Sequence, residues 1–228
     1  MLNKIIDKLL GLINVSNTYD ARNIELELQR RALKETAIFV EKYLLKTRSF
    51  QDKMSLLKYS VDLSDQEGLF IEFGVYKGDT LNYIASHLEE KIIYGFDSFE
   101  GLPEDWRNGF HKGVFELEEL PAVKENVELV KGWFEDTLPE FVSKHSEKCS
   151  FIHIDCDLYS STKTIFKFLN EKIEKGTVIV FDEFFNYPGW KNGEFKAFME
   201  FIELNHMKFE YIGYCRYDEQ VAIRISGD

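Results

Sequence analysis

The chain has 228 residues, of which 44% are hydrophobic and 15% aromatic, and its formal net charge is −12 at pH 7. This size and composition predict one large folded domain, alone or with an appendage, and argue against disorder. The negative charge argues against binding to nucleic acid or to an anionic membrane surface, because both need a cationic face. Cys149, Cys156 and Cys215 lack metal-binding spacing, so we expect reduced core thiols and a cytoplasmic location.

The first 62 residues are expected to form a helical appendage. Residues 1–13 carry Leu and Ile at helical spacing, but Asp7 and Lys8 interrupt them and the run is too short to span a membrane. We expect an amphipathic helix that packs on the body or on a second subunit, with contact to a membrane surface as the alternative. Residues 23–45 and 49–63 have the periodicity of two further helices. These N-terminal helices are the expected contact of a homo-oligomer.

After residue 68 the pattern changes to short apolar runs that alternate with helical segments. Five runs have the length and composition of strands: LFIEF, KIIYGF, NVELVKG, SFIHID and TVIVF. Helical segments are expected at 80–90, 138–145 and 160–175. The alternation predicts a parallel sheet with crossover helices.

The C-terminal part is expected to close this sheet with a hairpin. After a helix at 194–205, the runs KFEYIGYC and QVAIRI are separated only by RYDE, which is typical of antiparallel strands. Residues 98–126 have no periodicity, and we expect a lid or binding loop there.

Acidic residues end four of the five predicted parallel strands. They are Glu72, Asp97, Asp155 and the pair Asp182-Glu183. Ligands of open parallel sheets bind at the carboxyl ends of the strands. Solvation explains one or two such residues, but four on one rim predict a binding site.

The segment after the first strand has the features of a cofactor loop. Gly74 permits a ligand to approach the backbone, and Gly78 permits close packing of a helix. Thr80 stands at a helix N-terminus, whose free amides attract a carboxylate. Asp97 is placed to accept two ribose hydroxyls, with a helix-capping or loop role as the alternative. The spacing E-x-G-x-x-x-G differs from the dinucleotide fingerprint, which disfavours a nicotinamide oxidoreductase, and a simple turn is the alternative.

Five motifs in order carry a family resemblance: IEFGVYKGDT, GFDSFEGLP, GWFEDTLP, HIDCDLYSST and VFDEFFNYPGW. They resemble those of class I S-adenosylmethionine-dependent methyltransferases, and in particular the metal-dependent sugar O-methyltransferases typified by the macrocin and mycinamicin enzymes. The resemblance covers residues 69–228. It implies an α/β, Rossmann-like sheet of seven mostly parallel strands, the last antiparallel, with helices on both faces. This methyltransferase domain would span residues 63–228, behind a lid or dimer-contact appendage of residues 1–62.

The resemblance also implies the ligands and their residues. S-adenosyl-L-methionine would be held by Glu72, Gly74, Tyr76, Gly78, Thr80, Asp97, Ser98 and Asp155. Gly132 and Trp133, after the third predicted strand, offer an aromatic face to its base, with ordinary core packing of Trp133 as the alternative. A divalent cation, Mg²⁺, would be held by Asp155, Asp182 and Glu183. At the positions of Asp182 and Glu183 the family carries Asp-Asp or Asp-Asn. The side chain of Glu183 is therefore one methylene longer than that of the family's second residue. Asp157 is the alternative ligand.

These carboxylates also suit a metal on chemical grounds. Mg²⁺ prefers hard oxygen ligands, and a bound cation lowers the pKa of a hydroxyl and fixes it for attack. A solvated acidic rim is the alternative. Catechol-type relatives place a lysine where this chain has Leu158, so we expect Asp155 as the base, with His111 as the second candidate. His153, inside an apolar strand, is expected to be a core imidazole.

We therefore expect a Mg²⁺-assisted O-methyltransferase that acts on a hydroxyl of a sugar or glycosylated small molecule, in natural-product or polysaccharide biosynthesis. Trp106, Phe110, Tyr187 and Trp190 are candidates to stack on the sugar, with loop packing as the alternative. A phenolic or catechol-like acceptor is the second hypothesis. A non-catalytic, cofactor-binding partner protein is the third.

Overall fold

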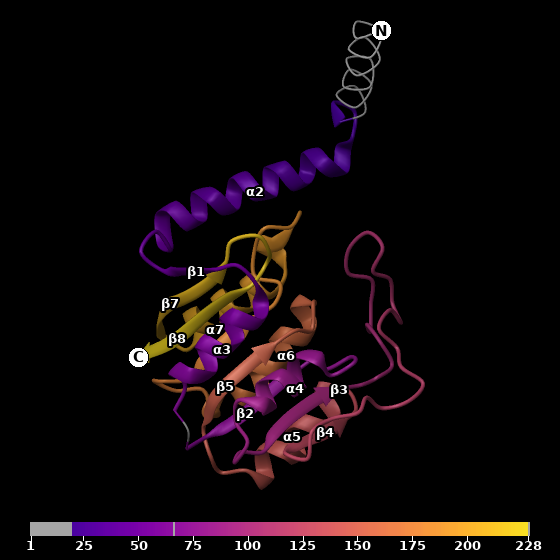
Figure 1. Cartoon of the computed structure of the whole chain (residues 1–228), viewed down its shortest axis with the longest axis vertical. Coiled ribbons are helices and arrows are strands. Elements are labelled where there is room, and N and C mark those ends of the chain that lie inside the picture. Colours follow the sequence, from indigo (N-terminus) through magenta and orange to yellow (C-terminus); the bar gives the residue numbers. More distant parts are fainter. Residues whose placement is uncertain (1–19, 66, 228) are drawn as a thin grey trace, which may run out of the picture.

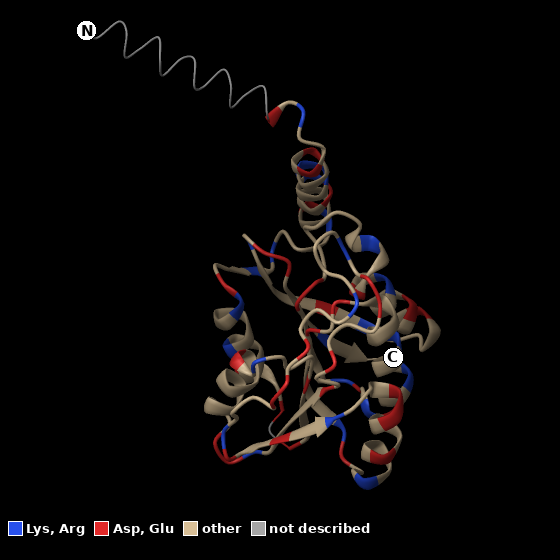
Figure 2. Ribbon diagram, turned by 90° about the vertical axis from the view of Figure 1, so that its right-hand side faces the viewer, with Lys and Arg blue, Asp and Glu red and all other residues tan. Residues whose placement is uncertain are grey.

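The computed structural model describes residues 20–65 and 67–227 (Figure 1). The helix expected in residues 1–13 lies outside this range. Within it there are six α-helices and eight strands. The strands form one mixed sheet, and helices lie on both of its faces. None of the described helices has both the length and the apolar character that crossing a bilayer requires. Lys and Arg are scattered among Asp and Glu along the ribbon in the view of Figure 2.

The sheet has the strand order β1-β7-β8-β6-β5-β2-β3-β4. The strands are β1 (Arg48–Phe50), β2 (Leu69–Phe73), β3 (Ile93–Asp97), β4 (Val127–Lys131), β5 (Cys149–Ile154), β6 (Val178–Phe181), β7 (Lys208–Cys215) and β8 (Val221–Gly227). Only β8 runs antiparallel to its neighbours β6 and β7, which confirms the predicted antiparallel last strand. The chain runs outward from β2 to β3 and β4, then returns to β5 on the other side of β2. The order of the sheet therefore reverses between β2 and β5.

The predicted number of seven strands was wrong, because β1 was missed. This strand of three residues pairs in parallel with β7, with Phe50 opposite Cys215. Three residues are too few to show an alternating pattern, and they adjoin a segment with helical spacing. The pairing with the distant β7 is what makes this segment a strand.

Two apolar layers hold the helices on the sheet. On one face, α3 (Lys53–Leu63) and α4 (Asp79–Ser86) bury Leu56, Leu57 and Leu81. The other face is covered by α5 (Phe134–Lys144), α6 (Tyr159–Leu169) and α7 (Glu194–Leu204), and two short 3₁₀ segments, η1 (Asn170–Lys172) and η2 (Trp190–Asn192), complete the described structure. The three cysteines are free and buried, as expected.

The N-terminal helices pack on the body. The helix α2 (Ile24–Tyr43) lies beside the β1–β7 end of the sheet and places Ala32 in the main apolar core (Figure 1). Asp52 caps α3 by accepting a hydrogen bond from the amide of Ser55, so this helix begins at Lys53 rather than at the predicted residue 49. The boundary at residue 62 and the homo-oligomer contact stay predictions.

Residues 98–126 contain no helix or strand, as predicted. This segment, called here the 98–126 loop, is held at two points. The guanidinium of Arg107 donates from one nitrogen to both carboxylate oxygens of Glu219, each at 3.0 Å. The side-chain amide of Asn108 donates to Glu25 of α2 at 2.7 Å. The loop is thus tied to both the N-terminal and the C-terminal parts of the chain.

Candidate active site

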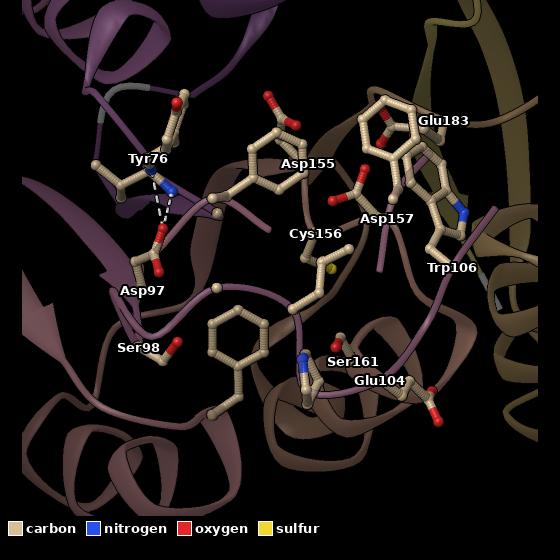
Figure 3. A pocket seen from close by; sticks show the side chains of 18 of the residues that line it. Tyr76, Asp97, Ser98, Glu104, Trp106, Asp155, Cys156, Asp157, Ser161 and Glu183 are labelled. Carbon is tan, nitrogen blue, oxygen red and sulfur yellow. Dashed lines mark hydrogen bonds between the residues drawn. The ribbon is translucent and has the colours of Figure 1, made fainter. Parts of the chain in front are cut away.

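A cavity of about 750 Å³ lies at the carboxyl ends of β2, β3 and β5, beneath the 98–126 loop. This is the position where the strand order reverses, and where open α/β sheets bind ligands. Asp97 and Ser98 lie on one side of the cavity, and Asp157, Glu183 and Trp106 lie on the other (Figure 3). Asp155 lies between the two groups (Figure 3).

The structure brings most of the predicted residues to this cavity. Those that line it are Gly74, Tyr76, Thr80, Asp97, Ser98, Trp133, Asp155 and Glu183. Those that do not are Glu72, Gly78, Gly132, Asp182 and His111. The alternative metal ligand Asp157 also lines the cavity, as do Trp106 and Phe110 of the 98–126 loop.

Gly74 allows the backbones of β2 and β5 to approach each other at the cavity wall. Its φ is +89°, and a Cβ built there would lie 1.7 Å from the carbonyl oxygen of Asp155. The sequence predicted that a ligand would need this space, but in the structure the neighbouring strand already fills it. Gly74 therefore sets the position of the Asp155 backbone.

We expect Gly74→Ala to destabilise the fold by more than the roughly 1–3 kcal/mol of a strained backbone alone. Gly189→Ala is the matched control, since Gly189 has nearly the same φ, +88°, and a Cβ there would meet nothing within 4 Å. Urea denaturation of both variants gives the free energies of unfolding. Equal losses in the two variants would show that the contact with Asp155 is unimportant.

Asp97 fixes the backbone conformation of the segment that follows β2. Its Oδ2 accepts hydrogen bonds from the amides of Val75 at 2.8 Å and Tyr76 at 2.9 Å, and its Oδ1 accepts one from Phe99 at 2.7 Å. A carboxylate has about four acceptor positions, so three are used by the protein itself. The remaining position belongs to Oδ1, which leaves it open to a ligand hydroxyl at the cavity.

Glu72 lies behind the cavity wall with no exposed surface. It accepts hydrogen bonds from the hydroxyl of Thr80 at 3.1 Å and from Nδ1 of His153 at 2.8 Å. On the other side of the ring, Nε2 of His153 lies 3.7 Å from Oδ1 of Asp182, close enough for an ion pair but too long for a hydrogen bond. Burial alone would lower the pKa of His153, but attraction to Asp182 and Glu72 outweighs it and raises this pKa to about 10.

His153 is therefore buried, as predicted, but as an imidazolium between two carboxylates. Glu72 stabilises that charge from within the sheet. The sequence predicted Glu72 at a strand end and His153 inside a strand. It gave no sign that they pair, because their contact arises only where β2 and β5 lie side by side in the sheet.

Lys53 is a site residue that the sequence analysis missed. Its ammonium lies 3.0 Å from Oδ2 of Asp182 and 3.5 Å from Oδ2 of Asp155, and the residue lines the cavity. Burial opposes the charge, but attraction to Asp155 and Asp182 prevails and raises the pKa of Lys53 above its ordinary value. Lys53 lies 129 residues before Asp182, at the start of a helix with other polar residues. No local sequence motif therefore indicates that it belongs to the site.

Three side chains converge as candidate metal ligands. One donor atom each of His153, Asp155 and Asp182 lies within 4.8 Å of the others. Oδ1 of Asp182 is buried and accepts no hydrogen bond from the described residues, and the Asp155 side chain is 24% exposed toward the cavity. Two carboxylates supply hard oxygen donors, one of them open to solvent, and such donors fit a cation such as Mg²⁺.

Glu183, the third predicted ligand, faces a different neighbour. Its amide donates to Oε2 of Glu194 at 3.2 Å, and burial, reinforced by the nearby Asp182, raises the pKa of its carboxyl well above the ordinary range. Its Oε2 is buried without a hydrogen-bond partner among the described residues. Asp157, the alternative ligand, has a pKa raised to about 7 by burial and by Asp182.

The two candidate bases differ in their surroundings. Burial raises the pKa of Asp155 to about 8, and the carboxylate of Asp182 adds to the shift, so this group can take up a proton near neutral pH. The side chain of His111 is 73% exposed, and its Nδ1 lies 3.7 Å from Oδ1 of Asp105, outside the cavity lining. The geometry favours Asp155.

The four aromatic residues that were predicted to stack on a sugar fall into two groups. Trp106 and Phe110 line the cavity, and the guanidinium of Arg107 stacks 3.8 Å from the Trp106 ring centre. Tyr187 and Trp190 do not line the cavity. Trp190 is 2% exposed and packs among core rings, so it is unable to stack on a ligand there.

A family model described as a methyltransferase domain matches residues 71–184. The chain is 26% identical over 159 residues to the 8-demethyl-8-(2,3-dimethoxy-alpha-L-rhamnosyl)-tetracenomycin-C 4'-O-methyltransferase of Streptomyces olivaceus, covering 58% of this chain and 60% of that protein. It is 24% identical over 156 residues to the demethyldecarbamoylnovobiocin O-methyltransferase of Streptomyces niveus, covering 57% and 58%. The chain thus spans about three fifths of the length of these curated relatives.

Solved structures show the same fold. The calicheamicin methyltransferase CalS11 superposes with a TM-score of 0.59 at 23% identity, covering 77% of each chain. The O-methyltransferase NovP superposes with a TM-score of 0.57 at 20% identity, covering 77% of this chain and 79% of that one.

Proposed function

The chain belongs to the methyltransferase domain family, and from that premise we propose that it is an S-adenosylmethionine-dependent O-methyltransferase acting on a hydroxyl of a sugar or glycosylated small molecule. The observation that carries the proposal is the cavity where the strand order reverses, with Asp97 and the Gly74 loop on one side and Asp155 with further carboxylates on the other. Such a cavity has room for a nucleoside donor and a second molecule.

The donor would bind on the Asp97 side. The free acceptor position of Asp97, the hydroxyl of Ser98 and the backbone after Gly74 are the polar groups there. Trp133, which follows β4 beside β3, also lines the cavity, and its ring would offer an apolar face to a base. Together with Tyr76 and Thr80, these groups suit a ligand that carries a base, a ribose and a charged tail.

The acceptor would bind between Asp155 and the rings of Trp106 and Phe110. Methyl transfer forms an oxygen–methyl bond as the sulfur–methyl bond breaks, and the hydroxyl proton must leave the acceptor. Asp155, with its pKa raised to about 8, is the group in the cavity suited to accept that proton. The remaining contribution of the protein is to hold the two reactants in line.

Mg²⁺ is the second proposed cofactor. Asp155 and Asp182 would hold it, with Glu183 or Asp157 as the further oxygen donor, and the bound ion would lower the pKa of the acceptor hydroxyl. Donor atoms of Asp155 and Asp182 lie within 4.8 Å of each other, which supports this assignment.

Sugar acceptors are favoured over phenolic ones by two observations. A curated relative is named as a 4'-O-methyltransferase of a rhamnosyl-bearing tetracenomycin. The position of the catechol-type lysine is occupied by Leu158, which is buried with 5% exposure. A non-catalytic role is disfavoured because the chain keeps acidic residues at the cavity, namely Asp97, Asp155, Asp157 and Glu183.

We expect calorimetry to detect binding of S-adenosylmethionine, but not of a nicotinamide cofactor, to the full chain. Turnover of the donor should need an acceptor with adjacent hydroxyls on a sugar and should increase with Mg²⁺. Catechol is the comparison acceptor, and donor hydrolysis without acceptor is the blank. Binding of the donor without turnover across a panel of glycosides would favour the non-catalytic hypothesis, and turnover with catechol alone would favour the phenolic one.

A further inference from the structure

We propose that Lys53 is a tethered cation that occupies the metal position, so that a divalent ion binds only by displacing its ammonium from Asp155 and Asp182. The inference deepens the proposed function and rests on it in one respect, since it takes these two carboxylates as the metal ligands.

The first argument is the position of the ammonium. It lies 3.0 Å from an oxygen of Asp182 and 3.5 Å from an oxygen of Asp155, and these residues follow different strands. Mg²⁺ binds carboxylate oxygens at about 2.0–2.1 Å. An ion shared by the same two oxygens would therefore take the space of the ammonium, and the two cations would also repel each other.

The second argument is the placement of Lys53 on its helix. It is the first residue of α3, where the helix dipole disfavours a positive charge. The side chains of Lys53, Asp155 and Asp182 are 30%, 24% and 8% exposed, so the pairs are shielded from bulk water. The two carboxylates supply the reason for a lysine at this otherwise unfavourable position.

The third argument is that the backbone is fixed while the side chain is free to move. Asp52 accepts hydrogen bonds from both the amide and the hydroxyl of Ser55, each at 2.9 Å, and Leu56 and Leu57 of the same helix are fully buried. The lysine has a flexible four-carbon stem and borders the cavity. The ammonium therefore has a path out of the carboxylate pair that needs no movement of the helix.

A tethered cation has two consequences. Without metal, it neutralises part of the charge of the carboxylate cluster, so the fold does not depend on an ion. With metal, the lost ion pairs oppose binding, so removal of the ammonium should strengthen the affinity for a divalent cation, by roughly tenfold if the shielded pairs are worth about 1.4 kcal/mol.

The test is a Mn²⁺ titration of the full chain, without donor or acceptor, in which electron paramagnetic resonance measures the free ion. We expect Lys53→Met to bind Mn²⁺ about tenfold more tightly than the wild type. Lys53→Arg, which keeps the cation, should resemble the wild type. Lys58→Met is the matched control, because Lys58 lies on the same helix and pairs at 2.6 Å with Asp62 outside the main cavity.

The outcomes separate this inference from the proposed function. Mn²⁺ affinity of Lys53→Met equal to or weaker than that of the wild type would overturn the displacement of Lys53 but leave methyl transfer and the metal site intact. Absence of Mn²⁺ binding in all four proteins would overturn both the displacement and the metal part of the proposed function. Circular dichroism and thermal unfolding of each variant confirm that the comparison is made on folded protein.

Discussion

Asp155→Asn is expected to lower kcat of methyl transfer by about 10²–10⁴-fold, the contribution typical of a general base. Asparagine keeps the size of the side chain but is unable to accept the hydroxyl proton. Asp155 lines the cavity between the donor and acceptor sides, and burial raises its pKa to about 8. Single-turnover rates with S-adenosylmethionine and a glycoside acceptor measure the effect on the chemical step.

The control is Asp105→Asn on the 98–126 loop, because the side chain of Asp105 is 75% exposed. It should leave kcat within about twofold of the wild type, since exposed polar positions contribute little. Donor binding by calorimetry and Mn²⁺ binding on the same samples distinguish a lost base from a lost cofactor or ion. An Asp155→Asn protein that kept about a tenth or more of the wild-type kcat would exclude Asp155 as the base.

Glu72→Ala should destabilise the fold by about 3–5 kcal/mol, because removing one partner of a buried ion pair leaves the other charge uncompensated. Glu72 and His153 both have 0% exposure, and their atoms lie 2.8 Å apart. Urea denaturation gives the free energy of unfolding. Glu27→Ala, on the exposed part of α2, is the control and should change stability by less than about 0.5 kcal/mol.

The same pair predicts a pH dependence. The pKa of His153 is raised from 6.5 to about 10 in the folded protein, so the folded state binds this proton more tightly than the unfolded state. The resulting stability is fully present below pH 6.5 and is lost as the pH rises through about 10. Glu72→Ala removes one of the attractions that raise this pKa, so its stability should fall less steeply over that range. A variant with unchanged stability and pH dependence would contradict a charged His153.

The sequence predicted the part of the fold that depends on local periodicity. The apolar runs of β2, β5 and β6 and the short link between β7 and β8 are visible in neighbouring residues, so the parallel sheet and its antiparallel last strand were confirmed. The strand β1 was not predictable, because three residues become a strand only through pairing with β7.

The candidate site shows the same division. Asp97 and Asp155 were found because a strand end is a local feature, and the structure brings both to the cavity. Lys53 was missed because its role depends on where α3 begins relative to β5 and β6. The pairing of Glu72 with His153 was missed because two adjacent strands create it. Residues defined by their own neighbours in sequence were predictable, and residues defined by distant partners were not.

The strand β1 also changes what shortening the chain would do. It covers the outer edge of β7 over the three positions from Gly213 to Cys215. A protein trimmed to begin at α3 would keep five helices on the sheet but uncover those backbone donors and acceptors. Bare strand edges recruit further strands from other molecules. Loss of the three residues of β1, of which only Phe50 is buried, would thus lower the solubility of the trimmed protein.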